Sequence, residues 1–319
     1  MKYLIVILCD SAPSFCHYTH GKRGRTPKLM PISVLTDVIN MAMKENLVLQ
    51  FVWPEYELPE EYNRVIKYTN HIDIRPYASS QPAEIIVLER SELQRLPLTD
   101  FPHLHNVSIR LTFDEFISAT QELTLALHKI DRMNISVEFP EHLQERAVCL
   151  YDNTLERLSE QIVKEYKADH PVQLNILTDR LSLSRMNNCN SGTDSLCTAP
   201  DGNLYICPGF YYDRSEPVGK VVGGFKIKNP QLYRLEYAPI CRICDAYHCR
   251  RCVWQNQKST LETNTPGHEQ CVISHLERNA SCRLLRRLRE EGCCPDGVSD
   301  ISEVDFLDPF YNLPRIRLK

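Results

Sequence analysis

The stretch Y-L-I-V-I-L-C-D-S-A-P-S-F-C-H-Y, from Tyr3 to Tyr18, joins an apolar run to a loop with two cysteines. Six consecutive apolar residues are typical of a strand that is buried on both faces, as in parallel sheets. Cys9 and Cys16 follow this run closely, with Pro13 between them. Because sites in parallel α/β folds lie at the carboxyl ends of the strands, both cysteines are candidate cofactor ligands.

The first half of the chain alternates between strand-like and helix-like patterns. Short apolar runs predict strands, and apolar residues three or four positions apart predict helices. The strand-like runs are 3–8, 47–52, 72–74, 84–88, 107–111, 135–139 and 172–177, and the clearest helical patterns are 32–43, 113–130 and 153–166. Such alternation predicts an α/β fold with a parallel sheet and crossover helices. Because a closed barrel needs eight strands, we expect a partial (β/α) barrel.

The cysteines are concentrated in the second half of the chain. Of 14 cysteines in 319 residues, 11 lie between Cys189 and Cys294. No apolar run is long enough for a membrane span, and the amino-terminal run is too short for a signal peptide, so we expect a cytoplasmic protein. Thiols stay reduced there, which favours metal ligation over disulfides. The net charge of −4 gives no indication of nucleic-acid binding.

The spacing of eight of these cysteines indicates two closed metal sites. The segment C-R-I-C-D-A-Y-H-C-R-R-C contains two Cys-x2-Cys pairs, and the tight turn within such a pair directs both sulfurs at one point. The turn P-D-G-N, from Pro200 to Asn203, predicts a hairpin that brings Cys197 and Cys207 together. Four thiolates hold one zinc ion or one iron–sulfur cluster, and spacing alone does not separate these metals. The candidate ligands are Cys189, Cys197, Cys207, Cys241, Cys244, Cys249, Cys252 and Cys271.

This pattern resembles the SPASM domain of radical-SAM peptide maturases, which carries two auxiliary [4Fe-4S] clusters. The family pattern is a Cys, then a Gly with a Cys five residues on, then a run of four Cys and a final Cys. The resemblance covers about residues 188–275, and the second and third intervals of the four-Cys run are each one residue shorter here. It implies one cluster on Cys189, Cys197, Cys207 and Cys252 and another on Cys241, Cys244, Cys249 and Cys271.

The first half resembles the radical-SAM partial barrel, whose signature after the first strand is C-x3-C-x2-C. Cys9 matches its first cysteine and Cys16 its third, but Pro13 stands at the middle position and offers no side-chain ligand. In that family three thiolates leave one iron open for S-adenosylmethionine. A Gly-Gly-Glu-Pro stretch of the family is replaced by F-V-W-P-E-Y-E-L-P, from Phe51 to Pro59, which lacks both glycines. The resemblance implies a barrel that has lost its usual S-adenosylmethionine site.

The sequence as a whole resembles the CXXX repeat peptide maturases, which are paired with ribosomally made peptides bearing Cys at every fourth residue. This implies a role in maturing a Cys-repeat precursor peptide, with a partner radical-SAM enzyme performing the radical step. Two alternatives stay open. Asp10 or His17 could replace the missing thiolate in an active radical enzyme, or zinc could hold a peptide-binding scaffold without redox chemistry.

The change in composition divides the chain into three predicted segments. Residues 1–188 form the degenerate radical-SAM-like partial barrel, and residues 189–275 form the SPASM-like iron–sulfur domain. Residues 276–319 form a carboxyl-terminal helix and tail.

Overall fold

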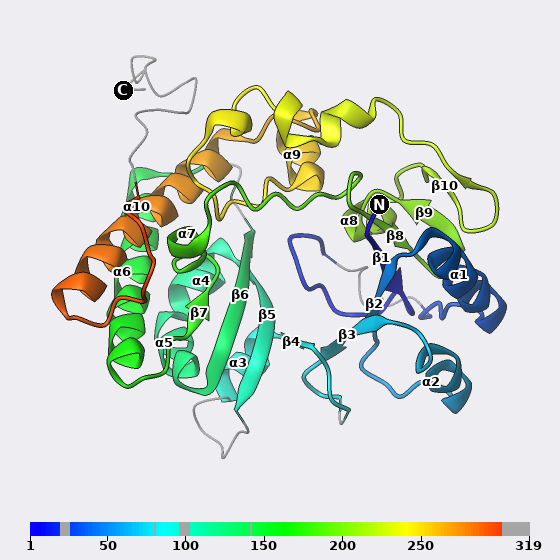
Figure 1. The fold of residues 1–319 in the computed structure, drawn as a ribbon, viewed down its shortest axis with the longest axis horizontal. Helices are drawn as coiled ribbons and strands as arrows, with labels where there is room; N and C mark the ends of the chain where they lie inside the picture. The colour runs from blue at the N-terminus through cyan, green and yellow to red at the C-terminus, as the bar shows by residue number, and fades with distance from the viewer. Residues whose placement is uncertain (20–25, 80, 96–102, 139, 141, 302–319) are drawn as a thin grey trace.

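The computed structural model describes residues 1–19, 26–79, 81–95, 103–138, 140 and 142–301 (Figure 1). Within these residues, one eleven-stranded sheet runs in the order β11-β10-β9-β8-β1-β2-β3-β4-β5-β6-β7. Its strands are β1 (Tyr3–Ile7), β2 (Val48–Val52), β3 (His71–Pro76), β4 (Ile85–Leu88), β5 (Leu104–Thr112), β6 (Ile130–Glu138), β7 (Gln173–Leu174), β8 (Ser195–Thr198), β9 (Asn203–Tyr205), β10 (Gly219–Lys220) and β11 (Gly224–Phe225).

The strands β1 to β7 are parallel and lie in sequence order, as the alternating pattern predicted. Helices connect most of them and cover the outside of the curved sheet (Figure 1). The helices and 3-10 turns of this half are α1 (Ile32–Glu45), α2 (Glu60–Ile66), α3 (Arg90–Arg95), α4 (Phe113–Ser118), α5 (Thr120–Ala126), η2 (Leu127–Lys129), α6 (Glu145–Lys167) and α7 (Asp179–Ser182). This arrangement confirms the predicted α/β partial barrel.

Two predicted elements differ from the structure. The helix expected over 113–130 is divided into α4, α5 and η2, because the chain leaves helical geometry at Ala119, where ψ is 6°. The strand expected over 172–177 is reduced to β7. After Leu174 the chain turns, and the Thr178 side chain accepts a 2.8 Å hydrogen bond from the Leu174 backbone nitrogen.

The cysteine-rich half continues the same sheet. The strand β8 pairs in parallel with β1, so Leu196 lies opposite Leu4, and β9 then pairs antiparallel with β8. The remaining elements are α8 (Pro208–Tyr212), η3 (Pro230–Tyr233), η4 (Leu235–Tyr237), η5 (Cys241–Ile243), α9 (Val253–Thr260) and α10 (His268–Glu290). The sheet thus runs across residue 188, and α10 runs across residue 275, while the division into three segments stays a prediction. The tail after Ile301 lies outside the described residues.

The core has two large parts that follow the two ends of the sheet. One part packs β5 and β6 against α4 to α6 and α10, with Phe116 and Leu158 completely buried. The long helices α6 and α10 lie side by side (Figure 1), and the Tyr151 hydroxyl donates a 2.5 Å hydrogen bond to Glu277 between them. The other part packs β1, β2 and β8 against α1, with Val6 and Phe51 completely buried. Among the described helices, not one has the length and apolarity to cross a bilayer.

Candidate metal centre

Cys9 lies at the carboxyl end of β1 and is completely buried. Its Sγ atom is 3.2 Å from the Ser11 hydroxyl oxygen and accepts a 3.1 Å hydrogen bond from the Tyr56 hydroxyl. Burial, together with this bond, raises the pKa of Tyr56 well above its ordinary value. Asp10 accepts a 2.7 Å hydrogen bond from the Lys28 backbone nitrogen. The Cys9 sulfur and the neighbouring carboxylate are therefore both engaged by groups of the first half.

The loop after Cys9 is anchored on both sides of Pro13. The buried Tyr18 hydroxyl donates a 3.2 Å hydrogen bond to the Pro13 carbonyl, and the Ser108 hydroxyl of β5 donates a 2.7 Å bond to the Phe15 carbonyl. Cys16, in the same segment, has a pKa raised to about 12, first by burial and next by the neighbouring Cys189. Cys16 therefore lies beside a cysteine of the second half.

Four cysteines of the second half form the first thiol group, which consists of Cys189, Cys197, Cys207 and Cys252. Cys197 is on β8, Cys207 and Cys252 directly precede α8 and α9, and the Cys189 backbone nitrogen donates a 2.8 Å hydrogen bond to the Arg250 carbonyl. Burial raises the pKa of Cys207 and then Cys252, Cys16 and Cys189 raise it further. Burial likewise raises the pKa of Cys252, followed by Cys189 and Cys16. The structure thus brings Cys189, Cys207 and Cys252 together, with Cys16 as a neighbour.

Cys197 also has Cys16 as a neighbour, which places it near the other three cysteines of the first thiol group. Its side chain is completely buried, and burial raises the pKa of its thiol well above normal, followed by the nearby Asp201 and Cys16. The hairpin of β8 and β9, predicted from the P-D-G-N turn, is present and places Cys197 opposite Tyr205, two residues before Cys207. The four thiols of the first group and the thiol of Cys16 therefore lie in one neighbourhood.

The other four cysteines form the second thiol group, which consists of Cys241, Cys244, Cys249 and Cys271. All four line one small cavity, which is completed by Arg251, Gln270 and His275 among others. Burial is the largest cause that raises the pKa values of Cys241 and Cys244, each to about 12. The structure therefore places these four cysteines together at one cavity, and their role as metal ligands stays a prediction.

His275 is a residue of this site that sequence reasoning missed. Its Nε2 atom lies 3.6 Å from the Cys244 Sγ atom. The donor atoms of Cys244, Asp245 and His275 all lie within 4.8 Å of one another. Cys271 and His275 are both on α10. Because residues four apart in a helix share a face, the Cys-x3-His spacing was the available signal.

Arg251 lies between the two thiol groups and is 1% exposed. Its Nε atom donates a 2.9 Å hydrogen bond to Asn188, and its Nη2 atom donates to the Tyr233 carbonyl. Its Nη1 atom is buried and has no hydrogen-bond partner among the described residues. A buried cation of this kind is costly unless an anionic group balances it. Thiolates that hold a metal supply such charge, so the residues fit a metal-loaded site.

The carboxyl ends of β2 and β3 are filled by their own side chains. The Trp53 ring is 3% exposed, and its indole nitrogen donates a 2.7 Å hydrogen bond to Asp73. The Arg75 guanidinium lies 3.6 Å from the centre of the Trp53 ring and pairs with Asp73 at 3.0 Å. Trp53 belongs to the stretch from Phe51 to Pro59, and its ring, stacked on the Arg75 guanidinium, occupies this end of the sheet.

Tyrosines also occupy the space next to Cys9. The Tyr212 ring stacks on the Tyr18 ring with centroids 5.3 Å apart. Burial raises the pKa of Tyr212, and Cys197 and Cys9 both contribute to the rise. Tyr212 therefore has Cys9 and Cys197 as neighbours, and its ring lies between the barrel loop and the cysteine-rich half.

No protein-family model and no curated protein matches the sequence. Solved structures do match the fold. Hexahistidine-tagged anSMEcpe with bound AdoMet matches with a TM-score of 0.62 and 11% identity, over 93% of this chain and 97% of that chain. The fold resembles that of anSMEcpe. Native anSMEcpe with AdoMet and Cp18Cys peptide matches with a TM-score of 0.59 and 10% identity, over 91% of this chain and 99% of that chain.

A third anSMEcpe structure, with AdoMet and Kp18Cys peptide, gives a TM-score of 0.58 at 11% identity over 91% of this chain and 100% of that chain. The likeness to anSMEcpe spans almost the whole of both chains, so it covers the barrel and the cysteine-rich half together. At such low identity it establishes the fold. The predicted α/β architecture of the radical-SAM type is therefore confirmed, while the ligands of each site stay predictions.

Proposed function

We propose that this chain acts in maturation of a Cys-repeat peptide, as a SPASM-like iron–sulfur protein that works with a partner radical-SAM enzyme. The observation that carries the proposal is the distribution of thiols. Eight cysteines gather in two groups on either side of Arg251, whereas Cys9 is bonded within the first half and Cys16 neighbours the first thiol group. The fold adds support, because anSMEcpe has been solved with AdoMet and with a peptide named Cp18Cys.

The two thiol groups would each hold one [4Fe-4S] cluster. Clusters of this type transfer single electrons, and a peptide thiolate would bind one by displacing one of its four cysteine ligands. The Nη1 atom of Arg251, which has no hydrogen-bond partner among the described residues, would lie near the charge of both clusters. His275 would change the reduction potential of a cluster in the second thiol group through its 3.6 Å contact with Cys244. Peptide thiols would approach these sites from solvent.

Side chains at the barrel end of the sheet favour the accessory role over an active radical enzyme. Pro13 replaces a thiolate, and the Cys9 sulfur accepts a hydrogen bond from Tyr56. Trp53 packs where the family places two glycines. Of the two substitute ligands considered, Asp10 lies with Cys9, and His17 directly follows Cys16 and has a pKa lowered to about 4, mainly by burial. A partner enzyme would then supply the radical step.

The decisive experiment counts iron, acid-labile sulfide and zinc in the anaerobically reconstituted chain. We expect about eight irons in the wild type and in C9S/C16S, and about four in C207S/C252S and in C241S/C244S. Cys149→Ser is the matched control, because Cys149 is exposed on α6 and belongs to neither group. A loss of all iron in one double variant would mean that the two groups do not load independently.

Two other results would replace the proposal. About twelve irons, falling to eight in C9S/C16S, would assign a third cluster to the barrel and make the chain a radical enzyme. Zinc without sulfide would make it a zinc-held peptide-binding scaffold. Calorimetric titration with S-adenosylmethionine separates the first two readings, since we expect no binding heat from the accessory protein.

The peptide partner is tested by titration with a synthetic Cys-repeat peptide and with its Ser-substituted twin. We expect the Cys peptide alone to change the electron paramagnetic resonance spectrum of the reduced clusters. Equal binding of both peptides without a spectral change would contradict recognition through thiolates.

A further inference from the structure

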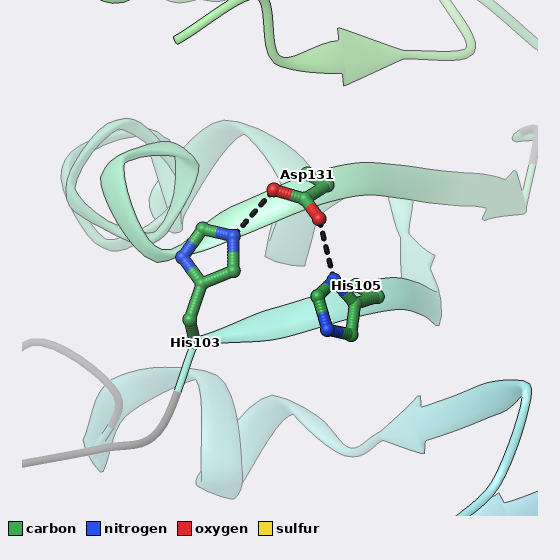
Figure 2. Close-up of side chains that lie close together, drawn as sticks. All are labelled: His103, His105 and Asp131. Carbon is green, nitrogen blue, oxygen red and sulfur yellow. Dashed lines mark hydrogen bonds and ion pairs between the residues drawn. The ribbon is translucent and has the colours of Figure 1, made fainter.

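A cluster of candidate metal ligands, separate from the two thiol groups, lies at the amino ends of two strands of the sheet. His103 directly precedes β5, His105 is on β5, and Asp131 is the second residue of β6. The register pairs Leu104 with Ile130, so these residues meet at the amino ends of the two strands. Figure 2 shows the three side chains pointing toward one another. This end of the sheet has no part in the proposed maturation site.

The three side chains meet through their donor atoms. His105 Nδ1 lies 2.6 Å from one carboxylate oxygen of Asp131, and His103 Nε2 contacts the other (Figure 2). All three donor atoms lie within 4.8 Å of one another. His103 and His105 share a face of β5 because side chains alternate along a strand. The alternation of side chains along the strand therefore directs the imidazoles of His103 and His105 toward the same carboxylate, that of Asp131.

A third imidazole, that of His170, completes the cluster. His170 Nε2 lies 3.6 Å from Asp131, and the ring of His170 packs edge-on against that of His103 with centroids 5.6 Å apart. This Nε2 atom is buried and has no hydrogen-bond partner among the described residues. The other nitrogen, Nδ1, is 3.0 Å from Glu165. A carboxylate on one nitrogen fixes the proton there and leaves the other nitrogen free to bind a metal.

The charge of the cluster also suits a cation. The Asp131 carboxylate contacts His103 through one oxygen and His105 through the other. Glu165 is buried and contacts both His170 and His128, the latter at 3.2 Å. Three imidazoles and one carboxylate are the donor set that zinc and similar divalent transition metals prefer, whereas iron–sulfur clusters prefer thiolates.

We propose that His103, His105, His170 and Asp131 form a binding site for one divalent transition-metal ion, with Glu165 orienting His170. The ion would replace the direct contacts between Asp131 and the two exposed histidines with bonds to the metal. The site is distinct from the two thiol groups in position and in donor chemistry. It would join β5, β6 and the segment before β7 at the amino ends of the strands.

The test uses the full chain with both thiol groups already loaded with iron and sulfide, so that added zinc chloride does not bind to these eight cysteines. Calorimetric titration should show one further zinc per chain in the wild type. H103A/H105A should lose it, and Glu165→Gln should weaken the affinity about 10–100-fold. His142→Ala is the matched control, because His142 is exposed and outside the cluster; it should bind as the wild type does.

Cobalt absorption adds a readout that identifies the ligands. Cobalt bound to nitrogen and oxygen should give visible bands without sulfur-to-metal charge transfer. His105→Ala alone is the fallback variant if the double variant misfolds, since the His105 side chain is 86% exposed. Zinc binding that is equal in the wild type and in H103A/H105A, a sulfur-to-cobalt signature, or the absence of any further zinc equivalent would each overturn the proposal.

Discussion

The ring of Tyr18 lies parallel to the ring of Tyr212, with centroids 5.3 Å apart and planes inclined by 9°. Tyr18 belongs to the loop that carries both amino-terminal cysteines, whereas Tyr212 is the last residue of α8, which begins directly after Cys207. The pair joins the barrel to the cysteine-rich half. Its two hydroxyls differ, because that of Tyr18 donates to the Pro13 carbonyl and that of Tyr212 is buried without a hydrogen-bond partner among the described residues.

This difference predicts unequal effects of two matched substitutions. Tyr18→Phe should lower the free energy of unfolding by about 1 kcal/mol, because the buried Pro13 carbonyl loses its donor. Tyr212→Phe should leave stability unchanged or slightly higher, since it removes a buried hydroxyl that has no partner among the described residues. Urea unfolding of the iron-free chain measures both. Equal losses would show that the Tyr212 hydroxyl is satisfied in solution.

Arg251 predicts a link between metal loading and stability. Arg251→Met should lower the thermal midpoint of the iron-loaded chain more than that of the iron-free chain, because the guanidinium balances anionic charge only in the loaded state. It should also speed iron release to a chelator. Arg242→Met is the control, since Arg242 is exposed on η5. An identical shift in both states would mean that Arg251 only fills space.

His275 predicts a local effect on the second thiol group. Loss of a hydrogen bond to the Cys244 sulfur should lower the reduction potential of a cluster there by roughly 40 mV, which corresponds to about 1 kcal/mol for one electron. His275→Ala is therefore compared with His268→Ala, which removes an exposed histidine from the same helix. Redox titration in the C207S/C252S background isolates the second group. Equal reduction potentials in the two variants would show that the contact between His275 and Cys244 does not influence the cluster.

The raised thiol pKa values predict slow alkylation of the iron-free chain. With a pKa of about 12, Cys16 and Cys241 are thiolates in about one molecule in ten thousand at pH 8. Cys149 is exposed and should react first with iodoacetamide. Raising the pH to 10 should speed the reaction of Cys16 about 100-fold, and 6–8 M urea should abolish the difference between sites. Mass spectrometry of the proteolytic peptides measures the extent of alkylation at each cysteine.

The same pKa values set the pH dependence of metal loading. Because the thiol form is stabilised by burial, a metal must displace protons as it binds, and loading weakens as the pH falls. Iron retention measured from pH 9 down to pH 6 should therefore decline. A flat profile would show that the sulfurs are already ionised in the iron-free chain.

Local pattern was enough to locate the strands of the barrel. Each apolar run of the first half contains or overlaps a strand of the parallel sheet, because a strand buried on both faces leaves a continuous apolar signature. The break at Ala119 left no such signature, since the apolar spacing continues on both sides of it. Pairing of β8 with β1 was also missed, because it joins residues 192 positions apart.

The candidate site shows the same limit. Cysteine spacing and family resemblance predicted which sulfurs would gather, since the turns between them are short. The neighbourhood of Cys16 and the first thiol group depends on how the loop after β1 packs on β5. Arg251, Tyr212 and the histidines around Asp131 gain their roles from residues far away in the sequence. Periodicity and motif spacing carry no information on such contacts.

The position of β8 beside β1 has a consequence for synthesis of the chain. Strand β1 leaves the ribosome before the other strands of the sheet, but Tyr3 pairs with Ser195, which is made 192 residues later. At 5–20 residues per second, this interval is about 10–40 s. During that time the outer edge of β1 has unpaired backbone groups and a run of apolar side chains, the combination that promotes aggregation of nascent chains. Correct folding thus depends on protection of the first strand until the cysteine-rich half has been translated.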